Sequence, residues 1–175
     1  ADSRGKTETR ALWAQDVWRF APGWKATFGG RLERWRAFEG RNLTAGVNAV
    51  QPGLGASTFS PKAAISWEVN NNWVVSASAG RAYRFPTVIE LYKSATVGGV
   101  TSFPNPNLLP ENALSTEVSV ERAIPDGRLR ASFFYESVKD ALISQNTLLP
   151  GGIAATVNNV DRTRGQGVEL VYQQN

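Results

Sequence analysis

The ionisable side chains of this sequence do not form a catalytic set. The chain of 175 residues contains no His, Cys or Met, which excludes Ser-His-Asp chemistry, thiol chemistry and zinc-finger sites. Its carboxylates stand singly in alternating segments, with no histidine to orient: Asp16, Glu33, Glu68, Glu117, Glu121, Glu136 and Glu169. We therefore expect a protein that is not an enzyme, uses no cofactor and has no metal site of its own.

Basic and aromatic side chains could instead bind a ligand. Arg81 and Arg84 would attract an anionic ligand. Aromatic side chains around them offer surface to a ligand: Tyr83, Phe85, Tyr92 and Phe103. The alternative is that these rings pack their own segment against itself or the neighbouring strands. Arg81 falls on the apolar parity of its segment, from where it could reach lipid headgroups.

The remaining charges are dispersed. Lys and Arg number 19 against 15 Asp and Glu, a net charge of +4, and no basic run suggests nucleic acid. Five basic residues of the polar parity, Lys25, Arg31, Lys62, Arg128 and Arg130, interleave with glutamates. We interpret them as a hydrated wall whose charges pair across strands. The alternative is that these basic residues form a path for an anionic ligand.

A period of two in hydrophobicity predicts the elements that carry these residues. From Phe59 to Val69, apolar side chains occupy one parity and polar side chains the other. Six such segments are predicted as strands: 25–32, 59–69, 73–80, 114–121, 128–136 and 167–172. The segment 9–20 is a seventh, but either facing puts a hydrophilic residue on the apolar side, so its facing stays open.

Short and long connections alternate strictly along the chain. Tight turns are predicted at 21–24, 70–72 and 124–127, which are rich in Pro, Gly, Asn and Asp. Long loops are predicted at 39–58, 83–112 and 141–156. Within the second loop, Pro86 to Tyr92 should form one or two helical turns with Pro86 at the first position. All the tight turns then lie at one end of the sheet.

Strand length and aromatic placement favour a membrane over a soluble core. The expected strands approach the roughly 9 to 11 residues that cross a bilayer. Aromatic residues near the tight turns would form an interfacial girdle: Trp18, Trp24, Trp67, Trp73 and Tyr172. The alternative is that they are ordinary core residues of a sandwich. We predict an all-β fold, an antiparallel up-and-down transmembrane β-barrel segment of about seven strands, with short periplasmic turns and long extracellular loops.

An odd number of strands indicates an incomplete barrel. Bacterial single-chain barrels have an even strand number, and seven open strands would expose two unpaired edges. We therefore expect residues 1–175 to be a partial β-barrel domain excised from a longer protein.

Several short sequence motifs follow one another in an order that is typical of one protein family. Residues 80–92, GRAYRFPTVIELY, resemble the G-R-x-F-R-x-P-T-x-x-E-L-Y signature of TonB-dependent outer-membrane receptors, and 105–111, NPNLLPE, resemble the N-P-N-L-x-P-E word that follows it. Phe85 departs from the alanine usual there. The motif positions are Pro86, Thr87, Glu90, Leu91, Asn105, Pro106, Pro110 and Glu111. The resemblance extends over nearly the whole chain and is of the siderophore-receptor type.

The resemblance implies a barrel of about 22 strands, an N-terminal plug domain and energy supplied by a TonB protein through that plug. It implies a location in the outer membrane of a Gram-negative bacterium, among outer-membrane lipids. The implied function is import of a scarce chelated nutrient, with a ferric siderophore or a similar small ligand as partner and no nucleic acid. A passive channel or small structural barrel is the alternative, and a soluble carbohydrate-binding β-sandwich is a third.

Overall fold

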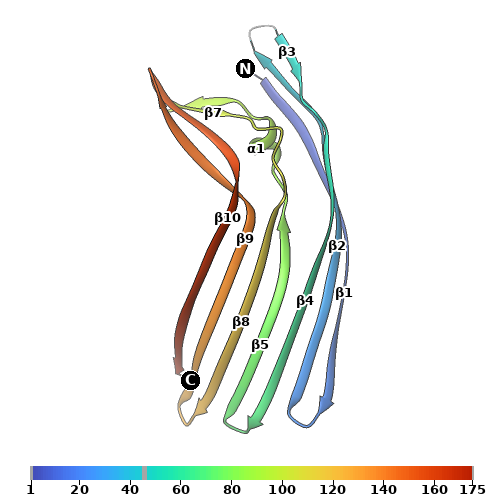
Figure 1. Cartoon of the computed structure of the whole chain (residues 1–175), viewed down its shortest axis with the longest axis vertical. Helices are drawn as coiled ribbons and strands as arrows, with labels where there is room; N and C mark the ends of the chain where they lie inside the picture. The colour runs from blue at the N-terminus through green and yellow to red at the C-terminus, as the bar shows by residue number, and fades with distance from the viewer. Residues whose placement is uncertain (1, 45–46, 175) are drawn as a thin grey trace.

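The chain forms one curved β-sheet (Figure 1). The computed structural model describes residues 2–44 and 47–174. The long strands are β1 (Asp2–Ala21), β2 (Trp24–Thr44), β4 (Leu54–Asn70), β5 (Trp73–Arg84), β8 (Glu111–Ile124), β9 (Gly127–Leu149) and β10 (Gly152–Gln174). Three short strands, β3 (Val47–Val50), β6 (Ala95–Val97) and β7 (Val100–Phe103), and one helix, α1 (Val88–Tyr92), lie in the connections. The all-β prediction is confirmed, and the expected seven strands are corrected to ten in the described ranges.

Long strands that follow one another in the chain pair antiparallel, in the order β1-β2-β4-β5-β8-β9-β10. The short β7 then joins β10 in parallel, with Val100 opposite Ile153 and Phe103 opposite Thr156. The sheet is therefore mixed, which corrects the prediction of a purely antiparallel one. It is also open, because within the described residues β1 pairs with β2 alone.

The three tight turns are confirmed and lie together at the lower end of the sheet (Figure 1). Gly23 has a φ of 74°, and a Cβ there would lie 2.7 Å from the carbonyl oxygen of Glu68. The Asn70 side chain accepts hydrogen bonds from the amides of Asn72 (2.9 Å) and Trp73 (3.1 Å). Turn-forming residues thus identify this end correctly.

The predicted long loops at 39–58 and 141–156 are mostly strand. β2 continues to Thr44 and β4 begins at Leu54, while β9 and β10 are separated by Pro150 and Gly151 alone. The strands continue through backbone hydrogen bonds, for which every residue except proline has both a donor and an acceptor. The loop at 83–112 keeps its irregular parts but holds α1, β6 and β7.

The strand register resolves which residues share a face. Residues directly opposite in antiparallel strands point to the same side, and Ile65, Ala77, Val118 and Phe133 follow one another across β4, β5, β8 and β9. We call their side the apolar face and the side of Lys25, Lys62 and Glu117 the polar face. On β1, Leu12 lies opposite Leu32, so Leu12, Ala14, Asp16 and Trp18 belong to the apolar face. The register shifts after Trp18, and the Phe20 ring lies 5.2 Å from the Trp18 ring. The facing left open by the sequence is thereby settled.

The apolar face is not covered by a second layer. Ile65, Val118 and Phe133 are 40%, 51% and 51% exposed, and all lie along one side of a single sheet. A sandwich would bury these side chains against another sheet, so the sandwich alternative finds no support.

Among the described residues, the single helix is too short to cross a membrane.

Candidate functional site

The polar face carries a network of charged and hydroxyl side chains in the half of the sheet nearer the tight turns. Arg130 donates to the Glu117 carboxylate at 2.5 Å and to the hydroxyls of Ser132 (3.1 Å) and Ser119 (3.3 Å). This network confirms the expected pairing of charges across strands for β8 and β9. Lys62, Glu117 and Glu136 also line an open hollow of about 520 Å³. The wall is therefore hydrophilic and suited to water or polar solutes.

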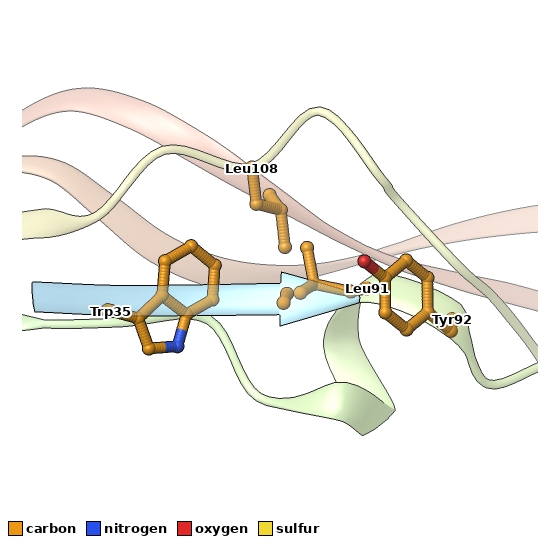
Figure 2. Close-up of a cluster of buried hydrophobic side chains, with 5 residues drawn as sticks. Trp35, Leu91, Tyr92 and Leu108 are labelled. Atoms are coloured by element: carbon orange, nitrogen blue, oxygen red, sulfur yellow. The ribbon is translucent and has the colours of Figure 1, made fainter. Parts of the chain in front are cut away.

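Buried apolar side chains gather on the polar face at the end opposite the tight turns. Trp35 shares the parity of Lys25 on β2 and is 2% exposed. It forms a cluster with Ala37, Leu91, Tyr92 and Leu108. Figure 2 shows Leu91 between Trp35 and Tyr92, with Leu108 pointing toward it. The segment 85–110 is thus folded over the polar face and anchored there by a small core.

Tyr92 is the centre of this anchor. Its side chain is fully buried, its hydroxyl donates to the Pro52 carbonyl at 3.0 Å, and its carbonyl accepts from the Asn42 side chain at 2.8 Å. A Cβ on Gly40 would lie 2.7 Å from the Tyr92 ring, so glycine is needed for the close approach. Tyr92 is corrected from a ligand candidate to a packing residue, because its ring presents no free surface.

Helix α1 begins with a capping box. Thr87 is the N-cap, its hydroxyl accepts from the Glu90 amide at 3.3 Å, and the Glu90 carboxylate accepts from the Thr87 amide at 2.8 Å. The expectation that Pro86 occupies the first helical position is therefore wrong. Pro86 precedes the cap and is buried.

Arg84 links the end of β5 to this helix. Its guanidinium lies 3.1 Å from the Glu90 carboxylate and 3.8 Å from that of Glu111. Partial burial raises the pKa of Glu90, but hydrogen bonds from Thr87 and Arg84 outweigh it, so its pKa is lowered. Arg84 is thus placed on the polar face but is engaged by two carboxylates.

Acid is expected to loosen α1. Because the pKa of Glu90 is lowered, its carboxylate stabilises the folded segment above its ordinary value of 4.5, and this contribution is lost as pH falls through the lower folded value. Amide hydrogen exchange of residues 87–92, corrected for intrinsic rates, should therefore accelerate below about pH 4.5. Glu90→Gln should exchange faster at pH 7 and show a weaker pH response. Identical pH responses in both proteins would contradict this role.

The second family word ties the same segment to β9 and β10. The Asn105 amide donates to the Glu90 carbonyl at 3.0 Å, and its side chain donates to the Val157 carbonyl at 3.0 Å. The Glu111 carboxylate accepts from the Leu142 amide at 2.9 Å. Pro106 and Pro110 lie in the irregular stretch between β7 and β8. In the structure, these motif residues hold the segment 85–110 against β9 and β10.

The proposed ligand residues do not form one site. Arg81 and Tyr83 share the parity of Val75 and Ala77 on β5 and lie on the apolar face. They are therefore separated from Arg84 on the polar face, and ligand contact by either residue stays a prediction. Phe85 stacks on Trp35 with ring centroids 5.4 Å apart. Phe103 is 46% exposed and borders the hollow described next.

A second hollow lies beside α1. It measures about 310 Å³ and is bordered by Glu90, Lys93, Val97, Phe103 and Val157. Its lining combines aliphatic side chains with one exposed cation and one carboxylate. Such a mixture suits an organic ligand with polar substituents. No group of three potential metal ligands occurs within residues 2–44 and 47–174.

The predicted girdle residues share one face near the tight turns. The register puts Trp18, Trp24, Trp67, Trp73 and Tyr172 on the apolar face. Trp24 stacks on Trp67 with centroids 5.2 Å apart, and the Arg122 guanidinium lies 5.2 Å from the Trp73 ring centre. A lipid interface at this level remains a prediction, supported by this arrangement.

Sequence reasoning missed Trp35, although a signal was present. Trp35 and Ala37 interrupt the polar parity of a strand that carries Lys25 and Arg31. Apolar residues on an otherwise hydrophilic face indicate something packed against that face. The predicted strand 25–32 ends before Trp35 and therefore does not include this interruption.

Comparison with known proteins identifies the family. The family described as TonB dependent receptor-like, beta-barrel matches residues 1–175. An iron-regulated outer membrane virulence protein of Vibrio cholerae is 27% identical over 132 residues, which are 73% of this chain and 18% of that protein. The vitamin B12 transporter BtuB of Vibrio vulnificus is 31% identical over 94 residues, 54% of this chain and 14% of the transporter.

A solved structure with the same fold is the hemophore receptor HasR of Serratia marcescens. It superposes with a TM-score of 0.78 at 18% identity, over 97% of this chain and 32% of the receptor. The chain spans only a small part of the curated relatives that it matches, 18% and 14% of their lengths. It belongs to the TonB-dependent receptor family, as part of the β-barrel, and its place is the outer membrane of a Gram-negative bacterium.

Proposed function

We propose that this chain forms part of the barrel wall of a receptor that imports a scarce, chelated nutrient across the outer membrane, with a ferric siderophore as the expected ligand. The polar face borders the lumen, and the apolar face contacts lipid. The observation that carries the proposal is a sheet with one exposed apolar face and one charged face, in a chain of this receptor family.

The nature of the ligand is inferred from the relatives and from the hollow beside α1. The relatives are named for iron regulation, vitamin B12 and a hemophore with heme. A hollow of about 310 Å³ with Lys93 and Phe103 at its border suits part of a bulky, partly aromatic chelate. Arg84, Phe85 and Phe103 are the predicted ligand residues that lie near the polar face or beside this hollow.

The energy source is part of the same proposal. Uptake against a gradient through a gated barrel would require a plug domain and a periplasmic TonB protein that contacts it. A passive channel is the alternative, and it would conduct its solute without either.

Transport assays separate these two functions. Cells that express the full-length protein should take up ⁵⁵Fe-labelled siderophore under iron limitation, and deletion of TonB should abolish that uptake. Phe103→Ala should weaken uptake by raising the KM. Leu148→Ala, at a side chain that is 83% exposed and does not border the hollow, is the control and should leave uptake unchanged. Uptake that persists without TonB would support the passive channel and overturn the proposal.

A further inference from the structure

A group of basic side chains lies on the apolar face, at the end opposite the tryptophans. The register places Lys139 of β9 directly opposite Arg162 of β10, and Arg164 two residues further along the same face. On the same face but near the opposite edge of the sheet, Arg10 of β1 lies directly opposite Arg34 of β2. Like charges directly opposite each other destabilise a sheet. Two such pairs on one face therefore call for a compensating anion.

The two pairs stand at the same level above the tight turns. Arg34 lies ten residues beyond Trp24, where β2 begins, and Lys139 lies twelve residues beyond Gly127, where β9 begins. At about 3.3 Å per residue and a tilt of about 40°, both lie about 25 to 30 Å above the turns. This is the height of the apolar band of a barrel. The basic group thus coincides with the upper membrane interface.

The two like-charged pairs differ in whether carboxylates neutralise them. Arg10 and Arg36 share the Glu8 carboxylate, with Arg36 at 2.7 Å. In the described part of the chain, Lys139, Arg162 and Arg164 form no ion pair and all are exposed. The neighbouring aspartates, Asp140 and Asp161, alternate to the polar face. Three uncompensated cations therefore project from the lipid-facing side.

We propose that Lys139, Arg162 and Arg164 bind the phosphate groups of the phosphorylated glycolipid in the outer leaflet. Arginine donates to phosphate oxygens in bidentate geometry, and each basic residue near a membrane surface strengthens attraction to anionic lipid. The acyl chains of the same lipid would lie on the apolar side chains below. The proposal depends on the outer-membrane location and not on the transport function.

Lipid binding to the purified full-length protein tests this site. Native mass spectrometry would compare diphosphoryl lipid A, the same lipid without its phosphates, and phosphatidylglycerol. We expect the native protein to prefer diphosphoryl lipid A, and the triple variant Lys139→Gln, Arg162→Gln, Arg164→Gln to bind it about tenfold more weakly. Arg122→Gln, on the same face near the turns, is the matched control and should bind normally.

The binding of the three lipids can either support or refute the proposed phosphate site. Equal binding of the phosphorylated and dephosphorylated lipids by the native protein would overturn the proposal, and this comparison needs no variant to fold. Equal binding of phosphatidylglycerol would replace the glycolipid with a general anionic lipid and also refute it. If the triple variant loses lipid binding but keeps normal siderophore uptake, the lipid site is supported independently of transport.

Discussion

Tyr92→Ala is expected to release the segment 85–110 from the polar face. The fully buried ring packs with Trp35, Leu91 and Leu108, and removing a large buried side chain costs about 3 to 5 kcal/mol. The cluster is the main apolar anchor of α1, so the change should act on local rather than global stability. Trypsin should then cleave after the exposed Lys93 at least tenfold faster in the folded receptor.

Tyr92→Phe provides the matched control. It keeps the ring and loses the hydrogen bond to the Pro52 carbonyl, so the loss should be about 1 kcal/mol. Cleavage after Lys93 should increase only modestly. If alanine and phenylalanine at position 92 give the same cleavage rate as the native residue, the buried cluster does not hold this segment.

A lysine in place of Val118 is expected to lower the free energy of unfolding in lipid by about 2 to 4 kcal/mol. Val118 is 51% exposed on the apolar face and lies between Ala77 and Phe133. A charged ammonium at that position would have to leave water for acyl chains. Urea unfolding of the full-length protein in phospholipid vesicles measures the loss.

Ser78→Lys is the control for this experiment. Ser78 lies beside Ala77 on β5 but points to the polar face, opposite Glu117. A lysine there would meet water and a carboxylate, so the free energy of unfolding should change by less than about 0.5 kcal/mol. Similar losses for both lysine variants would contradict the assignment of the two faces.

The fold was predictable where the two faces of a strand carry different side chains. Alternation of apolar and polar residues at 59–80 and 114–136 predicts strands that the structure contains. β9 extends to Leu149 and β10 begins at Gly152, in a region where the sequence does not alternate. Backbone hydrogen bonds extend the strands there, and the pattern of side chains gives no sign of it.

The site was less predictable for a related reason. The sequence motifs identify important residues of the 85–110 segment. They do not show that Glu90 binds Arg84 or that Tyr92 is buried against Trp35. Those contacts join positions far apart in the sequence. The face on which Arg81 lies could be predicted from the alternation of its strand alone. That Lys139 lies opposite Arg162 could be known only from the register of β9 and β10.

The most direct test of the account is a pair of collision measurements on spin labels. The chain has no cysteine, so Ile65→Cys, Val118→Cys and Phe133→Cys can each be labelled in the full-length protein in vesicles, provided the rest of that protein lacks accessible thiols. Ser66→Cys and Ser78→Cys report the opposite face. We predict that the first three labels collide with oxygen and the last two with a water-soluble nickel chelate. Equal access of the nickel chelate to both sets would show that the apolar face does not contact lipid.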